Sequence, residues 1–177
     1  MRNKIDSKLV YLDTSIFAGK VLLSDAEDKK CASLIDKISN KEFENWRFGT
    51  SKFALVELAE VISRQRTEDQ AKSILFDVMY NPDLAIYLLN PEPVHKTWVH
   101  KTRGKRQFFD IDLLIANLVN TALEYSIPGF DTIHAHTIKR LNEEVIAVSK
   151  DTDFNRFKGV KNVIDVVKAS EFLDKYK

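Results

Sequence analysis

Short apolar runs alternate with longer amphipathic segments along this chain. The runs are rich in Val, Ile, Leu and aromatic residues, which favours buried β-strands. The predicted strands are residues 9–12, 46–51, 85–89, 145–148 and 162–165. Apolar positions at helical spacing and capping residues predict helices after Asp13, after Ser24–Asp25, over 53–63, 67–80, 108–125 and 130–141, and at the C-terminus. Strands separated by long helices predict an α/β fold, a three-layer α/β/α sandwich around a mainly parallel sheet.

Length and composition limit the chain to one globular domain, residues 1–177. Hydrophobic residues make up 44% and charged residues 30%, a balance that argues against disorder. Because the formal net charge is only +1, any affinity for nucleic acid must come from clustered charge. Positive charge is concentrated near the end of an extended basic segment at about 80–107, where Lys101, Arg103, Lys105 and Arg106 stand. These four are candidate RNA phosphate contacts, although a solvated run of charge would have the same composition.

Cysteine content and hydropathy indicate the cellular setting. The one cysteine, Cys31, excludes an internal disulfide framework and a Cys-rich zinc site. No apolar stretch reaches the roughly 20 residues that a membrane-spanning helix requires. We therefore expect a soluble cytoplasmic protein with no membrane association.

Acidic residues follow the predicted strands where a ligand site is expected. Asp13 follows the first strand, Asp151 and Asp153 follow the strand at 145–148, and Glu57 and Asp131 lie near helix starts. In parallel α/β sheets, ligands bind outside the carboxyl ends of the strands. Each acid also has an ordinary interpretation, as a helix cap, a solvated helix residue or a turn residue, so the hypothesis depends on their joint placement.

A cluster of carboxylates needs positive charge among them, because like charges a few ångströms apart repel. A divalent cation would supply it. Oxygen ligands without cysteine or paired histidines favour Mg²⁺, or Mn²⁺, over zinc. The chemistry such an ion serves most naturally is hydrolysis of a phosphodiester by a metal-activated water. His134 lies one helical turn from Asp131, where it would orient a carboxylate, contact phosphate or serve only the structure.

Four segments together resemble the PIN-domain ribonucleases, in particular the VapC-like toxins of prokaryotic toxin–antitoxin systems. They occur in the family's order between residues 9 and 154, at 10–17, 50–60, 129–134 and 149–154. The resemblance implies an acidic quartet of Asp13, Glu57, Asp131 and Asp151, with Asp153 as an additional or substitute ligand. It also implies supporting hydroxyls from Thr14, Ser15 and Ser149.

By this resemblance the chain would be a Mg²⁺-dependent endoribonuclease and the toxin of a toxin–antitoxin pair. RNA would be the substrate, a small antitoxin the protein partner, and a homodimer the assembly. The alternative is a catalytically inactive PIN-like module that binds RNA or protein. The spacing from Glu57 to Asp131 is longer than expected for compact family members, and the additional residues lie at about 80–107.

Overall fold

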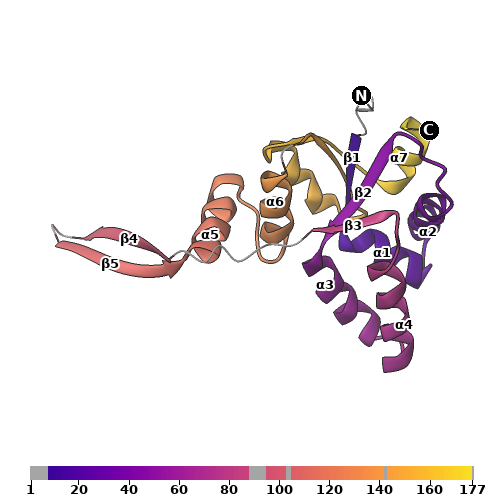
Figure 1. The fold of residues 1–177 in the computed structure, drawn as a ribbon, viewed down its shortest axis with the longest axis horizontal. Coiled ribbons are helices and arrows are strands. Elements are labelled where there is room, and N and C mark those ends of the chain that lie inside the picture. The colour runs from indigo at the N-terminus through magenta and orange to yellow at the C-terminus, as the bar shows by residue number, and fades with distance from the viewer. Residues whose placement is uncertain (1–7, 88–94, 103–104, 142, 177) are drawn as a thin grey trace, which may run out of the picture.

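A five-stranded, all-parallel sheet forms the centre of the molecule (Figure 1). The computed structural model describes the backbone of residues 8–87, 95–102, 105–141 and 143–176, and the side chains of these residues outside 86–113. The strands of the sheet are β1 (Lys8–Leu12), β2 (Trp46–Ser51), β3 (Leu84–Tyr87), β6 (Val145–Val148) and β7 (Val163–Val167), in the spatial order β3-β2-β1-β6-β7. The predicted parallel sheet is confirmed, and β1 lies at its centre.

Helices cover both faces of this sheet. They are α1 (Thr14–Leu22), α2 (Ala26–Ser39), α3 (Lys52–Ser63), α4 (Glu68–Met79), α5 (Leu113–Tyr125), α6 (Asp131–Arg140), α7 (Ala169–Lys175) and the 3₁₀ segment η1 (Thr152–Gly159). None of the helices in the described ranges is long and apolar enough to cross a membrane.

Alternation along β1 divides the core into two clusters. Val10 and Leu12 pack with apolar side chains of α1, α2, α3 and α7, whereas Leu9 and Tyr11 pack with those of α6 and η1. Successive side chains of a strand point to opposite faces, so a strand that is buried throughout contributes to both clusters. This confirms the predicted α/β/α sandwich, in which the predicted strand 9–12 is covered from both sides.

The strand ends place the polar candidates at one edge of the sheet. Tyr11 of β1 is in register with Gly49 of β2 and with Ala147 of β6. The residues two positions after these three are Asp13, Ser51 and Ser149. They therefore lie at the same carboxyl edge of the sheet. Asp13 and Ser51 also cap α1 and α3, so the same edge provides the amino ends of two helices.

The expected helix over 108–125 is wrong in its first five residues. β4 (His95–Thr102) and β5 (Lys105–Asp112) form an antiparallel hairpin, and α5 begins only at Leu113. The apolar residues within 108–111 fit a helical pattern, but pairing with β4 determines their conformation. A local sequence pattern contains no information about that pairing. The hairpin extends away from the parallel sheet beside α5 (Figure 1).

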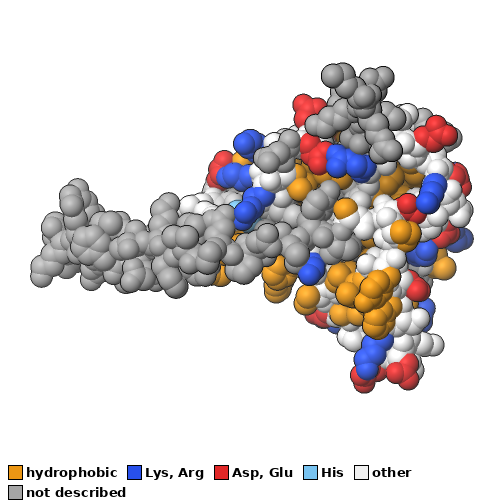
Figure 2. Space-filling model, in the orientation of Figure 1, with side chains coloured by type: hydrophobic (Ala, Val, Ile, Leu, Met, Phe, Trp, Pro, Cys, Tyr) orange, Lys and Arg blue, Asp and Glu red, His pale blue; other side chains and the backbone are white. Residues whose placement is uncertain are grey.

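Exposed apolar side chains gather at the C-terminal end of α4. Phe76 and Tyr80 are more than half exposed and Met79 is nearly half exposed, and the rings of Phe76 and Tyr80 are stacked with centroids 5.5 Å apart. Figure 2 shows an apolar patch where Figure 1 places α4. Ala71 is the one residue of α4 that is buried, so this helix packs on the domain through a narrow stripe.

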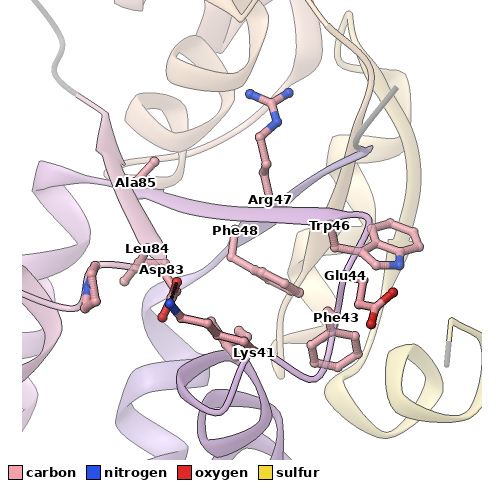
Figure 3. Close-up of a pocket in the computed structure, with 11 residues that line it drawn as sticks. Lys41, Phe43, Glu44, Trp46, Arg47, Phe48, Asp83, Leu84 and Ala85 are labelled. Atoms are coloured by element: carbon pink, nitrogen blue, oxygen red, sulfur yellow. Dashed lines mark ion pairs between the residues drawn. The ribbon is translucent and has the colours of Figure 1, made fainter. Parts of the chain in front are cut away.

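A cavity of about 610 Å³ lies at the other end of the sheet from Asp13. The residues that line it include the aromatic Phe43, Trp46 and Phe48 and the charged Lys41 and Asp83 (Figure 3). Trp46 and Leu84 begin β2 and β3, so the cavity opens at the amino ends of these strands. It is therefore separate from the site that the acidic residues form.

Candidate active site

Asp13 occupies the central position of the candidate site. It follows β1, is 7% exposed, and its backbone N–H donates to the carbonyl of Val148 in the neighbouring strand at 3.0 Å. Its Oδ2 accepts hydrogen bonds from the Ser15 hydroxyl at 2.6 Å, the Ser149 hydroxyl at 2.7 Å and the Ser15 backbone N–H at 3.3 Å. The predicted hydroxyls of Ser15 and Ser149 thus lie against Asp13 and fix its orientation.

Glu57 reaches the same edge from the second turn of α3. Its side chain is 25% exposed, and its Oε2 accepts from the Thr14 hydroxyl at 2.5 Å and lies 2.9 Å from Nε2 of His134. Burial alone would raise the pKa of Glu57, but the hydrogen bonds from His134 and Thr14 outweigh burial and lower it. These hydrogen bonds favour the ionised form of Glu57 and fix the position of its carboxylate. Thr14, which follows Asp13 in the chain, thereby connects Glu57 to the neighbourhood of Asp13.

Asp131 is the first residue of α6 and is half-buried. Burial raises its pKa, and the negative charge of Asp13 raises it further, with smaller contributions of the same sign from Glu57 and Asp151. His134 acts in the opposite direction. The charges of three carboxylates from three other segments therefore act on Asp131.

Asp151 and Asp153 lie after β6, at the start of η1. Asp151 caps η1, and its Oδ1 accepts from the backbone N–H of Asp153 at 2.9 Å, while the Asp151 N–H donates to the Ser149 hydroxyl. Both residues are exposed, and the carboxylate of Asp153 lies 3.6 Å from the guanidinium of Arg156. Asp151 thus acts as a cap and Asp153 lies in the first turn of η1, and a ligand role for either stays a prediction.

His134 has a closer connection to the acids than its spacing alone indicated. It is fully buried, and its Nδ1 lies 2.6 Å from the Tyr11 hydroxyl while its Nε2 faces Glu57. Burial would lower the pKa of His134, but the hydrogen bond with Glu57 and the charges of Asp13, Glu57 and Asp131 raise it. The position one turn after Asp131 was the only signal in the sequence for this contact.

A second buried carboxylate, which the sequence did not single out, supports the loop that carries Ser149 and Asp151. Asp28 of α2 is fully buried and accepts from the Lys150 ammonium at 2.6 Å and from the Ser24 backbone N–H at 2.8 Å. Lys150 also pairs with Asp25 at 2.7 Å. Lys150 stands between two candidate site residues, so this ion pair holds their loop against α2.

The basic candidates lie on the hairpin. Lys101 is in β4 opposite Arg106 of β5, and Lys105 begins β5 opposite Thr102. Arg103 lies outside the described residues. Lys101, Lys105 and Arg106 therefore lie on paired strands, and RNA contacts of these candidates stay a prediction.

The donor chemistry of the site suits a hard divalent cation, because every candidate ligand is a carboxylate oxygen. Within the described part of the chain, the hydrogen bonds to Asp13 all end on Oδ2 and those to Glu57 all end on Oε2, so one oxygen of each remains for an ion. No three His, Cys, Asp or Glu side chains of the described residues are arranged to hold a metal ion.

Comparison with known proteins identifies the fold. No model of a known protein family matches the sequence, and no curated protein matches it. Among solved structures, the chain matches the crystal structure of VapBC2 from Rickettsia felis bound to a DNA fragment from their promoter, with a TM-score of 0.56. The match covers 90% of this chain and 98% of the other, at 15% sequence identity.

This chain has the PIN-domain fold. Nearly the whole of the matched chain is covered, so the PIN fold accounts for the parallel sheet and its flanking helices together. At 15% identity the likeness establishes architecture, and the chemistry of this PIN fold must be argued from its own residues.

Proposed function

We propose that this chain is a metal-dependent endoribonuclease and the toxin of a toxin–antitoxin pair. The observation that carries the proposal is the buried, hydroxyl-oriented Asp13 at the carboxyl edge of the sheet, together with Asp131, whose pKa is raised by burial and by the charges of Asp13, Glu57 and Asp151. A carboxyl group whose pKa is raised by burial and by other acids is typical of a functional site, and a catalytic ion requires such acids. The PIN fold, shared with the VapC toxin of a VapBC complex, supports the same reaction class.

Each residue then has a distinct task. Asp13, Asp131 and Asp151 would hold Mg²⁺ or Mn²⁺, which supplies the positive charge that stabilises the developing charge on the phosphodiester oxygens. Ser15 and Ser149 orient Asp13 through Oδ2. Glu57, held by Thr14 and His134, would accept a hydrogen bond from the attacking water and direct it in line with the scissile bond.

RNA cleavage with and without EDTA tests the proposal directly. We expect Asp13→Asn to abolish Mg²⁺-dependent cleavage and to leave the far-UV circular dichroism spectrum unchanged, because the amide oxygen still accepts from Ser15 and Ser149. The matched control is Asp36→Asn, which removes an exposed carboxylate on α2 that pairs with Lys20 and should cleave like the wild type. Full activity in the Asp13 variant would exclude the mechanism.

The matched complex supports the proposal of a protein partner. The Rickettsia felis structure contains VapBC2 on promoter DNA, which supports a small antitoxin as the partner of this chain. Copurification of this chain with the product of a short neighbouring gene would test that assignment. Mn²⁺ binding without cleavage of any RNA would instead favour the alternative, a PIN-like module that binds RNA or protein.

A further inference from the structure

His134 joins four elements of the candidate site. The imidazole comes from α6, its Nδ1 meets the Tyr11 hydroxyl of β1 at 2.6 Å, and its Nε2 meets Glu57 of α3 at 2.9 Å. The same Glu57 oxygen accepts a hydrogen bond from the Thr14 hydroxyl of α1 at 2.5 Å. Both ring nitrogens are thus committed, in a position where the imidazole is fully buried.

The contacts of Nδ1 fit a nitrogen that accepts hydrogen bonds. The Tyr11 hydroxyl lies 2.6 Å from Nδ1 of His134, and the Ser51 hydroxyl lies 3.4 Å from the same nitrogen. Nε2 carries a proton in the neutral ring whose Nδ1 accepts, and also in the charged ring. In both forms Nε2 therefore donates to Glu57.

We propose that His134 is a positioning residue, which holds the Glu57 carboxylate in its working orientation by donating from Nε2 while Tyr11 fixes the ring. This inference rests on the proposed function, since it assigns a role within the same site. Glu57 lies on a helix that is partly exposed, and a glutamate side chain has three rotatable bonds. Two donors on one oxygen, His134 and Thr14, remove that freedom and leave the other oxygen for the metal or for water.

A merely structural histidine would fill the same space without affecting Glu57. Phe154 and Tyr11 contact the His134 ring edge-on, with centroids 6.3 Å and 5.8 Å away, so the ring also packs. The two roles differ in what a substitution changes. Loss of packing lowers stability, whereas loss of the Nε2 donor changes the position of Glu57 and the metal dependence of the site.

The test uses two substitutions of His134 and a control on the same helix. His134→Leu keeps an apolar side chain and removes the donor, and His134→Gln restores an N–H near the position of Nε2. The control is His136→Leu, which replaces a buried imidazole that faces Thr121 instead of the acids. We would measure the Mn²⁺ concentration that gives half-maximal RNA cleavage, the thermal midpoint, and the position of Glu57 in crystals of each metal-free variant.

We expect His134→Leu to raise the half-saturating Mn²⁺ concentration by about 10- to 100-fold, the usual effect of losing a group that orients a metal ligand. Its metal-free crystal structure should show the Glu57 carboxylate turned away from Thr14. His134→Gln should stay within a few-fold of the wild type and keep Glu57 in place. The control should change the thermal midpoint without changing the metal dependence.

Two results would overturn the inference, and they are distinguishable. If the wild type cleaves RNA and His134→Leu keeps both its metal dependence and its Glu57 position, the positioning role is wrong and the proposed function stands. If the wild type neither binds Mn²⁺ nor cleaves RNA, the function of the site is wrong and the role of His134 fails with it. Should His134→Leu not fold, Tyr11→Phe provides the same comparison, because it removes the hydroxyl that fixes the ring. Unchanged metal dependence in that variant would also contradict the positioning role.

Discussion

The ion pair between Asp28 and Lys150 gives a prediction whose size follows from the structure. Burial by itself would raise the pKa of Asp28, but hydrogen bonds from Lys150 and Ser24 lower it from 3.8 to about 2. A depression of nearly two units corresponds to about 2 kcal/mol of stability at neutral pH. The ammonium of Lys150 is one third exposed, and solvent screening reduces its share, so we expect about 1–2 kcal/mol.

The substitution Asp28→Asn removes this charge and keeps the shape of the side chain, but it turns the amide nitrogen toward one of the donors, Lys150 or Ser24. At pH 7 it should lower the free energy of unfolding by at least about 1–2 kcal/mol, or the thermal midpoint by at least roughly 2–8 °C for a chain of this size. The matched control is Asp36→Asn, whose carboxylate pairs with Lys20 at the surface and should cost under about 1 kcal/mol. Urea denaturation followed by circular dichroism measures both.

The pH dependence provides the sharper test. Because the folded-state pKa lies below the unfolded value, the contribution of Asp28 is present above pH 3.8 and is lost as the pH falls toward 2. About half of it should be gone by pH 3. The stability difference between wild type and Asp28→Asn should therefore be constant from pH 8 to 5 and then decrease. A difference that is absent at pH 7, or that grows on acidification, would refute the assignment.

Three further predictions concern the site and its support. Glu57→Gln should reduce cleavage by about 100-fold or more and leave the fold intact in circular dichroism, since the amide still accepts two hydrogen bonds but carries no charge. Burial and the charges of the other acids raise the pKa of Asp131, so calorimetric Mn²⁺ affinity should weaken on acidification at a higher pH than for an ordinary aspartate, and Asp131→Asn should remove that dependence. Gly19→Ala would place a Cβ 2.9 Å from both Asp28 Oδ1 and Cys31 Cβ, and should cost about 1–3 kcal/mol in urea denaturation; a neutral result would mean that α1 and α2 can separate at low cost.

The sequence predicted those parts of the fold that local signals specify. Seven residues, 9–15, predict a strand, the end of that strand and a helix cap. The structure confirms all three as β1, its end at Leu12 and the Asp13 cap of α1. The same holds for the strand at 145–148 and the turn after it. The carboxyl edge of a parallel sheet then brings Asp13 and Ser149 together, because adjacent strands end side by side.

Contacts between distant segments could not be predicted from the sequence in the same way. Residues 108–112 join β5 because β4 pairs with them, and their apolar pattern is equally compatible with a helix. The bond from His134 to Glu57 spans 77 positions, and the one from Lys150 to Asp28 spans 122. Such pairs depend on how α6 and α2 pack on the sheet, which no single segment encodes.

The position of β6 has a consequence for the timing of activity during synthesis. β6 lies beside β1 in the sheet although it is among the last strands to leave the ribosome, and the loop after it carries the serine that orients Asp13. A nascent polypeptide that ends before residue 145 lacks both Ser149 and Asp151. Under the proposed function, we therefore expect an incomplete translation product to have no nuclease activity, and the site to be completed only when most of the chain has been synthesised.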